Sequence, residues 1–338
     1  MSELRIAVVG AGLMGADHVT RITERIVGAR VAAIVEPDAG RAAAALTQAP
    51  GAVHYSNIED AIAGGGIDAV LIATPGQFHE PVLLPTLAAG LAILCEKPLT
   101  PDPESSLRVL EAEQRTGKKL IQVGFMRRFD REYMQLRELI ASGSAGELLA
   151  LRCAHRNADV PESYTNTMLI TDSVVHEIDI VRYLTDSPIV AIEVKHQKRN
   201  SLSPAHLQEP ILVLLETEAG VLADVEMNVS VQFGYQVKTE AVFERGIAEI
   251  GRTAGLALWQ DGRYGGVEHA SFKTRFADAY DTQIQRWVNA VARGTIDGPS
   301  AWDGYLVAAA CAAGVTALET GERVVVEYVD RPAFYDQA

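Results

Sequence analysis

A strand followed at once by a glycine-rich loop and a helix opens the chain. Residues 4–9 form an apolar run, residues 10–15 read G-x-G-x-x-G, and a helical pattern continues to about residue 27. In this context Gly10 permits a tight turn, Gly12 has no side chain to block a pyrophosphate, and Gly15 lets helix and strand pack closely. Free N–H groups at the helix start can then face phosphate oxygens. The segment therefore predicts a dinucleotide-binding βα unit.

The second strand indicates which dinucleotide is bound. It covers residues 31–35 and ends at Glu36, 21 residues after Gly15, where a carboxylate is expected to bind the adenosine ribose hydroxyls. A carboxylate there also repels a 2′-phosphate, so we predict NAD rather than NADP. Two alternatives stay open, because residues 36–38 can form a plain polar turn and Arg41 on the next helix could bind a phosphate.

Strands and helices keep alternating as far as residue 123. Strands are expected at residues 67–73, 91–94 and 119–123, with helices at about residues 80–89 and 103–116. This alternation predicts an α/β fold with a parallel, doubly wound sheet of the Rossmann type. His79 opens one of the helices, where it either contacts the nicotinamide or caps the helix.

The motif Glu96-Lys97-Pro98 comes just after the strand at residues 91–94. A Lys in this place lies at the carboxyl edge of the sheet, where open α/β sheets bind their ligands. Pro98 fixes the backbone after the Lys, and the Lys97–Pro98 bond can be cis. The alternative is an exposed Lys in an ordinary turn.

The pattern changes after Gly124. A helix at residues 131–141 precedes a series of longer strands, and helices at about residues 279–291 and 302–318 close the chain. The strands are expected at residues 148–155, 190–198, 211–217, 221–229, 236–244 and 247–250. This pattern predicts an open, mostly antiparallel sheet. We therefore expect a cofactor domain at residues 1–124 and a substrate-binding and oligomerisation domain at residues 125–338, whose C-terminal helix can pack back on the first.

One helix of the second half carries residues with possible chemistry. Apolar side chains repeat at helical spacing from residue 174 to residue 184, and Asp172 and His176, four residues apart, lie on one face with Asp179 three residues further on. A His beside a carboxylate can act as a general base. The alternatives are an Asp172 that caps the helix and pairs with the His, and a metal site, which no further His or Cys cluster supports.

Composition narrows the expected partners and the compartment. The 338 residues carry a net charge of −14 without a Lys or Arg cluster, so nucleic acid and anionic membranes are not expected as partners. Cys95, Cys153 and Cys311 lie far apart and indicate reduced thiols of a cytoplasmic protein. The N-terminus is not expected to be a signal peptide, and no apolar run reaches the roughly 18 residues typical of a membrane span.

These motifs together resemble the glucose–fructose oxidoreductase/inositol dehydrogenase/rhizopine catabolism (Gfo/Idh/MocA) family over essentially the whole chain. Members join a Rossmann domain to a C-terminal α/β domain with a large open sheet, and they oxidise or reduce sugars and cyclitols with NAD or NADP. The resemblance implies that Lys97, Asp172 and His176 are catalytic. It implies a cofactor site formed by Gly10, Gly12, Leu13, Met14, Gly15, Glu36, Ala73, Thr74, Pro75, His79, Glu96 and Lys97.

Finer motifs resemble the inositol dehydrogenases within this family. They lie at residues 124–130, 153–157, 175–179 and 301–305. By this resemblance the substrate site is formed by Lys97, Met126, Arg127, His155, Asn157, Asp172, His176, Asp179, Tyr235 and Tyr280. The chain departs from many relatives at residues 91–92, where they have a basic–polar pair, and at Glu36, where they have Asp.

The implied reaction is NAD-dependent oxidation of one secondary alcohol of a cyclitol, with myo-inositol as the expected substrate and 2-keto-myo-inositol (scyllo-inosose) as the product. His176 would take the hydroxyl proton, Asp172 would orient His176, and Lys97 would stabilise alkoxide charge, so no metal is needed. The alternatives are a dehydrogenase of scyllo-inositol, glucose or another pyranose, and a non-catalytic NAD-binding regulator. Because the second sheet has too few helices to cover both faces, we expect subunit contacts there, and the family implies a homotetramer.

Overall fold

The computed structural model describes residues 3–252 and 254–336. Two compact units make up the chain. The first contains the chain up to Phe125, Tyr280–Ala308 and the residues from Val329 onward, and the second contains Met126–Ala279 and Ala309–Tyr328. The first unit therefore combines the N-terminal part of the chain with segments from its C-terminal part.

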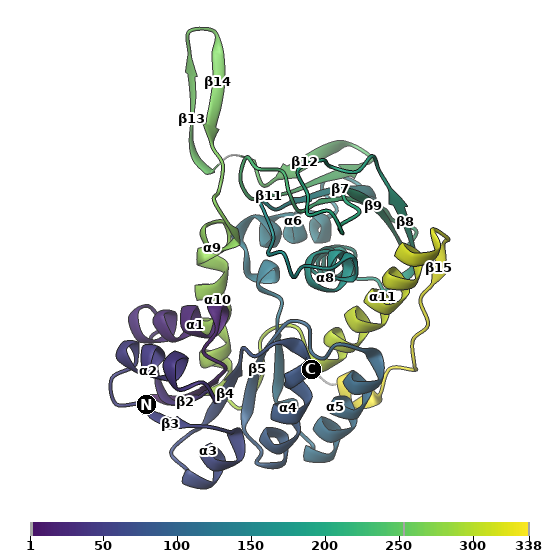
Figure 1. Cartoon of the computed structure of the whole chain (residues 1–338). Helices are drawn as coiled ribbons and strands as arrows, with labels where there is room; N and C mark the ends of the chain where they lie inside the picture. Colours follow the sequence, from purple (N-terminus) through teal and green to yellow (C-terminus); the bar gives the residue numbers. More distant parts are fainter. Residues whose placement is uncertain (1–2, 253, 337–338) are drawn as a thin grey trace. The chain divides into compact units, whose positions relative to one another are not determined.

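The first unit is built on a parallel sheet with the strand order β3-β2-β1-β4-β5-β6. The strands are β1 (Leu4–Val9), β2 (Ala29–Val35), β3 (Val53–Tyr55), β4 (Ala69–Ile72), β5 (Ala92–Glu96) and β6 (Ile121–Gly124). The connecting helices are α1 (Leu13–Glu24), α2 (Ala39–Gln48), α3 (Ile58–Gly64), α4 (His79–Ala88) and α5 (Pro103–Thr116). Figure 1 shows α1 and α2 on one side of this sheet and α4 and α5 on the other. The predicted doubly wound Rossmann sheet is confirmed, and its order reverses between β1 and β4, where such sheets bind ligands.

Local sequence explains where the predicted helices begin and end. Helix α5 begins after Asp102, whose side chain accepts a hydrogen bond from the Ser105 N–H, with Pro103 in the first turn. It ends at Gly117, which adopts the left-handed conformation. Strand β3 and helix α3 were not predicted, because β3 has only 3 residues and none of them is buried.

The core of the first unit joins the sheet to helix α10 (Ala277–Val291). Ile284, Trp287 and Val288 belong to the same buried cluster as Ile22 of α1 and Ile6 of β1. Each fully buried side chain of this size contributes roughly 1.5–3 kcal/mol to folding. The helix expected at about residues 279–291 is therefore part of the framework that holds α1 against the sheet.

The second unit is built on a seven-stranded sheet with the order β12-β11-β7-β10-β9-β8-β15. The strands are β7 (Leu148–Arg156), β8 (Ile189–His196), β9 (Ile211–Thr217), β10 (Leu222–Asn228), β11 (Gln236–Phe243), β12 (Gly246–Ile250) and β15 (Val324–Val325). Within this sheet β7 and β10 pair in parallel, and the other neighbours pair antiparallel. The prediction of a mostly antiparallel sheet is confirmed.

One face of this sheet is covered by helices. Figure 1 shows α6 (Arg131–Ser142) and α8 (Val175–Thr185) against it. Along β9, buried residues alternate strictly with half-buried ones, so every second side chain points away from these helices. The far face is partly accessible in the single chain.

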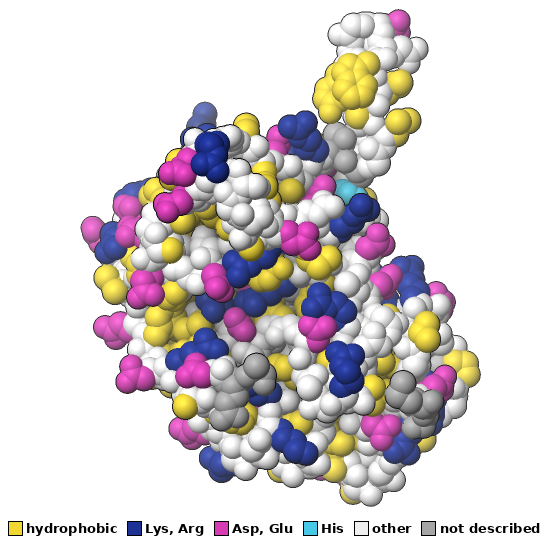
Figure 2. Space-filling model, turned by 180° about the vertical axis from the view of Figure 1, so that it is seen from behind, with side chains coloured by type: hydrophobic (Ala, Val, Ile, Leu, Met, Phe, Trp, Pro, Cys, Tyr) yellow, Lys and Arg dark blue, Asp and Glu magenta, His cyan; other side chains and the backbone are white. Residues whose placement is uncertain are grey.

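A two-stranded hairpin of β13 (Ala254–Gln260) and β14 (Arg263–Val267) was not predicted. Its side chains include Leu256, Trp259 and Val267, which are 83%, 72% and 72% exposed. Figure 2 shows hydrophobic side chains on this hairpin. The sequence pattern missed it because apolar residues and Gly mix there without a buried face.

Among the described residues, one helix is long and apolar enough to cross a membrane by length and composition. It is α11 (Ala301–Thr320), and 78% of its most apolar window is buried inside the protein. This burial is typical of a core helix.

Candidate active site

The glycine-rich loop between β1 and α1 leaves no space for side chains at two of its glycines. Gly10 has a φ of +86°, and a Cβ there would lie 2.9 Å from the Thr74 backbone nitrogen. A Cβ on Gly15 would lie 1.8 Å from the Gly10 carbonyl oxygen. A Cβ on Gly12 would meet nothing within 4 Å. The loop is therefore closed toward the protein and open at Gly12, as a pyrophosphate cradle requires.

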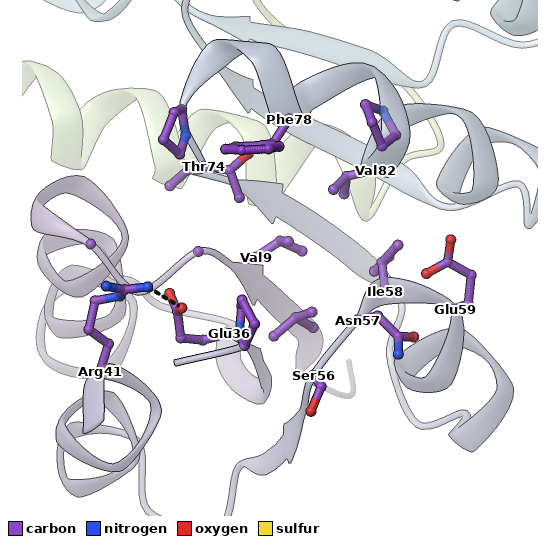
Figure 3. A pocket seen from close by; sticks show the side chains of 17 residues that line it. Val9, Glu36, Arg41, Ser56, Asn57, Ile58, Glu59, Thr74, Phe78 and Val82 are labelled. Carbon is purple, nitrogen blue, oxygen red and sulfur yellow. Dashed lines mark hydrogen bonds and ion pairs between the residues drawn. The ribbon is translucent and has the colours of Figure 1, made fainter. Parts of the chain in front are cut away.

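Glu36 lies at the end of β2, where the ribose-binding acid was predicted. Its carboxylate accepts hydrogen bonds from the Ala11 N–H at 2.8 Å, the Asp38 N–H at 3.0 Å and Arg41 Nη2 at 2.7 Å. Burial raises the pKa of Glu36, but these bonds outweigh it and hold the pKa below its ordinary value. Figure 3 shows Glu36 and Arg41 joined at one side of the pocket. Glu36 is thus ionised and shields Arg41 from a ligand phosphate.

A cavity of about 590 Å³ lies over the carboxyl ends of β1, β2 and β4. Figure 3 shows Phe78 and Val82 on one side and Ile58 and Asn57 on another. The predicted cofactor residues that line it are Gly10, Gly12, Glu36, Ala73, Thr74 and Pro75. Within the described chain, Thr74 Oγ1 is buried and has no hydrogen-bond partner. The open side of Gly12, the unpaired Thr74 hydroxyl and the carboxylate at β2 fit a dinucleotide.

Leu13 and Met14 begin α1, immediately after Gly12. Leu13 is 66% exposed and Met14 is half-buried. Their backbone N–H groups are among those that an α-helix leaves unpaired at its start. Any contribution of these two residues to phosphate binding therefore comes from their backbone.

His79 has both ring nitrogens occupied by the protein. Nδ1 lies 2.7 Å from the Pro98 carbonyl oxygen and Nε2 lies 2.8 Å from the Thr74 carbonyl oxygen. The ring is fully buried, and the N-cap of α4 is Phe78 with no side-chain cap bond. The alternative of a capping His is therefore wrong. The ring instead ties the loop after β4 to the loop that follows Lys97.

Lys97 lies directly after β5 and is half-buried. The Lys97–Pro98 bond is cis, which the sequence analysis had named as possible. The preceding Glu96 accepts a bond from the Lys97 N–H at 3.3 Å, and its Oε1 lies 2.7 Å from His18 Nε2. The backbone at Lys97 is therefore held by a buried pair between β5 and α1.

His18 was missed by the sequence analysis. It lies three residues after Gly15 on the buried side of α1, and none of its surface is exposed. The ring of Tyr280 meets it edge-on with centroids 5.9 Å apart, and Arg21 lies 5.2 Å from the centre of the Tyr280 ring. The signal that could have revealed His18 is a His at an apolar position of a helical stripe. Tyr280, predicted near the substrate, is 4% exposed in the first unit and supports His18.

In the second unit the helical segment that carries Asp172 begins earlier than expected. Thr165 caps the short helix α7 (Asn166–Met168), which continues into the π-helical turn η3 (Leu169–Val174) and then into α8. The alternative that Asp172 caps the helix is therefore wrong, because Asp172 lies inside this continuous segment. π-helical turns are frequent at functional sites, and here the turn places Asp172 at the surface of the chain.

His176 lies in the first turn of α8 and is 8% exposed. The ring of His155, at the end of β7, lies edge-on to it with centroids 6.4 Å apart. The ring of Tyr235 also lies edge-on to His155, with centroids 5.8 Å apart, and burial raises the pKa of Tyr235 to about 12. Three of the predicted substrate residues, from three separate segments, are thus brought together.

Glu177 is the main residue of this region that the sequence analysis missed. It is 1% exposed, its carboxylate pairs with Arg127, and its Oε2 lies 3.1 Å from His155 Nδ1. The signal was present, since Glu177 lies three residues after Val174 and four before Val181, both of which belong to the apolar stripe. A charged residue at such a position needs a buried partner.

The remaining predicted substrate residues of this unit differ in their surroundings. Asp179 accepts from Arg128, with Nη2 to Oδ1 at 2.6 Å, and is 1% exposed. Asn157 Oδ1 is buried without a hydrogen-bond partner among the described residues. Met126, beside Arg127, is 2% exposed. Of these, Asn157 has an acceptor left for a ligand, whereas Asp179 is held in an ion pair.

No group of three or more His, Cys, Asp or Glu side chains that could hold a metal ion occurs among the described residues.

Comparison with known proteins identifies the family. The Gfo/Idh/MocA oxidoreductase domain with an NAD-binding Rossmann fold matches residues 4–125, and the GFO/IDH/MocA C-terminal domain matches residues 133–249. The inositol 2-dehydrogenase of Corynebacterium glutamicum is 62% identical over 98% of this chain and 99% of its own, and that of Leifsonia xyli subsp. xyli is 61% identical over 98% of both.

A solved structure agrees with these relatives. Myo-inositol dehydrogenase from Lactobacillus casei, in complex with NAD(H) and myo-inositol, superposes with a TM-score of 0.95 at 33% identity, over 98% of this chain and 99% of that one. The resemblance drawn from the motifs is confirmed, and the chain belongs to the Gfo/Idh/MocA family of oxidoreductases.

Proposed function

We propose that this protein is an NAD-dependent inositol 2-dehydrogenase that oxidises myo-inositol to 2-keto-myo-inositol. The observation that carries the proposal is the 62% identity to the Corynebacterium glutamicum inositol 2-dehydrogenase across nearly the full length of both chains. The second candidate keeps the chemistry and changes the substrate to scyllo-inositol, glucose or another pyranose. A non-catalytic NAD-binding regulator is the more remote alternative.

The cofactor half of the proposal is supported by the first unit. Gly10, Gly12 and Gly15 shape the cradle, Ala73, Thr74 and Pro75 line the cavity, and Glu36 favours NAD over NADP. NAD, when bound, supplies the acceptor for the hydride. In this proposal the domain at residues 1–124 holds the cofactor and contributes Lys97 to the reaction, and the domain at residues 125–338 contributes most of the substrate-binding residues.

The catalytic roles are assigned to three residues. His176 in its neutral form takes the proton of the reacting hydroxyl, and Asp172 orients its ring. Lys97 donates a hydrogen bond to the same oxygen and stabilises the negative charge that develops there. Lys97 thereby supplies the positive charge, so this chain's own residues can perform the proton chemistry without a metal.

The substrate-binding roles follow from the chemistry of a cyclitol, which is almost entirely hydroxyl. Each hydroxyl needs a polar partner, and an unpaired buried group is costly. His155, Asn157, Tyr235 and Arg127 offer such partners in the second unit, with Met126 and Asp179 of that unit and Tyr280 of the first unit as supporting residues. The unpaired Asn157 Oδ1 supports this assignment, because a buried acceptor without a donor suits a ligand hydroxyl.

We further propose a cytoplasmic homotetramer that binds neither nucleic acid nor membranes. The accessible face of the seven-stranded sheet and the exposed apolar side chains of the β13–β14 hairpin support subunit contacts, since an isolated hairpin is marginally stable in water. Light scattering at micromolar concentration tests the assembly, and a strict monomer contradicts it.

The test of the activity is formation of NADH or NADPH with a panel of inositols and pyranoses, measured by nicotinamide absorbance. The proposal expects the highest kcat/KM for myo-inositol with NAD. If a pyranose or scyllo-inositol has the highest kcat/KM instead, the second candidate function is the correct one. Binding of NAD without turnover of any polyol would favour the regulator.

A further inference from the structure

A buried charged cluster of three residues lies beside His176 in the second unit. Arg127, in the 3-10 turn η2 (Met126–Phe129), donates through Nη1 to Glu177 Oε1, and Glu177 Oε2 lies 3.1 Å from His155 Nδ1. Arg127 and Glu177 are each 1% exposed and His155 is 3% exposed. Burying a charged pair with so little solvent contact is costly, so the arrangement calls for an explanation beyond packing.

The cluster determines which nitrogen of His155 carries the hydrogen. An ionised carboxylate can only accept, so the 3.1 Å contact with Glu177 requires a hydrogen on Nδ1. Arg127 Nη2 lies 3.2 Å from the same nitrogen and can only donate, but Arg127 already bonds to Glu177 through Nη1. Because a buried carboxylate facing a lone pair is the costlier arrangement, the Nδ1–H tautomer is favoured.

The charge state of Glu177 supports the same assignment. Burial raises the pKa of Glu177, yet the charge of the paired Arg127 and the hydrogen bonds to the carboxylate outweigh it and hold the pKa at about 2. Glu177 is therefore an acceptor throughout the neutral range.

In this tautomer Nε2 of His155 carries a lone pair. The protein contact at Nε2 is the Tyr235 hydroxyl at 3.5 Å, longer than the roughly 2.7–3.2 Å of an ordinary hydrogen bond. Asn157, which directly follows β7, has its Oδ1 buried without a partner among the described residues. His155 Nε2 and Asn157 Oδ1, two residues apart at the end of β7, can therefore each accept a hydrogen bond from a ligand hydroxyl. His155 also lies edge-on to His176.

We infer that Glu177 is a positioning residue that fixes His155 as a hydrogen-bond acceptor for one hydroxyl of the polyol, with Arg127 holding Glu177 in place. This inference rests on the proposed function, because it assigns the polyol to the region beside His176. The inference also predicts substrate specificity. A polyol analogue in which that hydroxyl is replaced by hydrogen or by a methyl ether cannot donate a hydrogen bond to His155 Nε2, so it should bind poorly.

The first experiment reads the tautomer without any substrate. The 8 histidines of the chain are labelled with ¹⁵N, and His155→Gln identifies the His155 signals. We expect a protonated Nδ1 and a bare Nε2 in the wild type. In Glu177→Gln, whose amide can donate, the hydrogen should move to Nε2. A wild-type His155 with its hydrogen on Nε2 overturns the inference.

The second experiment measures how strongly the enzyme recognises the polyol. Glu177→Gln should raise KM for the polyol about ten- to hundredfold, with a smaller change in kcat, and leave the dissociation constant of NADH in calorimetry unchanged. Discrimination against deoxy and O-methyl analogues should fall together with it. Glu216→Gln is the matched control, because Glu216, on β9 of the same unit, pairs with the exposed Arg323, and this variant should leave KM unchanged.

The outcomes separate this inference from the proposed function. An unchanged polyol KM in a folded Glu177→Gln protein overturns the role in recognition while the proposed function stands. If the wild type oxidises no polyol, the proposed function and the recognition role fail together, and the ¹⁵N spectra alone then decide the role of Glu177 toward His155.

Discussion

The cofactor cavity of the first unit and the charged cluster of the second are built by different means. The cavity is formed by backbone and small residues of short segments, such as the loop between β1 and α1 and the end of β4. The cluster is formed by the ion pair of Arg127 and Glu177, 50 residues apart in sequence, and by His155, which lies 22 residues before Glu177. The cavity therefore depends on glycines, which leave space for a ligand, and the cluster depends on the charges of its side chains.

This difference has an energetic consequence. A backbone cradle gains its selectivity from shape and is insensitive to pH, because its hydrogen-bonding groups do not titrate. A buried ion pair must recover a large desolvation penalty through its partners, so loss of one partner is severe and depends on pH. Function in the two units should therefore fail in different ways.

The largest effects are expected at two of the three assigned catalytic residues, one from each unit: Lys97→Ala and His176→Ala. Each should lower kcat on the order of 10²–10⁴-fold, because the hydroxyl oxygen loses either its proton acceptor or its charge stabilisation. Stopped-flow or steady-state kinetics with the best polyol measures this.

Measuring NADH binding by the His176→Ala variant separates the two units further. His176→Ala should leave the dissociation constant of NADH unchanged, because His176 belongs to the second unit. His196→Ala is the matched control, since His196 lies on β8 with an exposed side chain and should turn over normally. If both catalytic variants keep near-normal kcat, the assignment of roles is wrong.

The next effect is the stability contributed by Glu177. The pKa of its carboxyl falls from an ordinary 4.5 to about 2 in the folded chain, against the opposing effect of burial. A lowered pKa stabilises the fold above the unfolded value and loses that contribution as the pH falls through the folded value. Glu177→Gln should therefore lower the free energy of unfolding by about 3 kcal/mol at neutral pH.

Urea unfolding at a series of pH values measures this contribution. The gap between wild type and Glu177→Gln should narrow as the pH falls below 4.5. Glu216→Gln should show a far smaller gap, because the Glu216–Arg323 pair is exposed to solvent. A gap that stays constant with pH would mean that the charge of Glu177 is not what stabilises the unit.

A smaller effect distinguishes two glycines of the same loop. Gly12 has a φ of −72°, and an added Cβ meets no atom within 4 Å, so Gly12→Ala should fold normally. Its methyl group would occupy the space assigned to the pyrophosphate and should weaken NADH binding about ten- to hundredfold. Calorimetry measures the binding, and thermal unfolding measures the stability.

Gly15→Ala is the contrasting variant. Its Cβ would lie 1.8 Å from the Gly10 carbonyl oxygen, so the backbone must shift and the unfolding temperature should fall. If Gly12→Ala binds NADH as the wild type does, the phosphates do not pass over Gly12.

The same contrast explains what could be predicted from the sequence. Residues 10–15, Glu36 and the capped helix α5 are local patterns, so their structures followed from spacing and residue type. The π-helical turn at Asp172 and the buried pairs of His18 and Glu177 depend on segments that meet only in the folded chain. Their positions in apolar stripes were visible, but their partners were not. The β13–β14 hairpin was missed because no buried face imposes a pattern on it.

The smallest expected effect concerns cofactor choice at Glu36. Its carboxylate accepts from Arg41 Nη2 at 2.7 Å and is ionised, so it repels a 2′-phosphate and also occupies the nearest cation. Glu36→Gln removes the repulsion and leaves Arg41 available, while the amide oxygen can still accept from the Ala11 N–H. The ratio of kcat/KM for NAD over NADP should fall about tenfold.

The matched control for this variant is Glu24→Gln, which removes the same charge from an exposed position of α1. It should leave the ratio unchanged, which separates a local effect at the ribose from a change in net charge. Arg41→Ala added to Glu36→Gln should abolish the gain for NADP, because the gain requires a cation near the 2′-phosphate. If Glu36→Gln alone keeps the full preference for NAD, then shape rather than charge selects the cofactor, and the first unit recognises its ligand without relying on a titratable group.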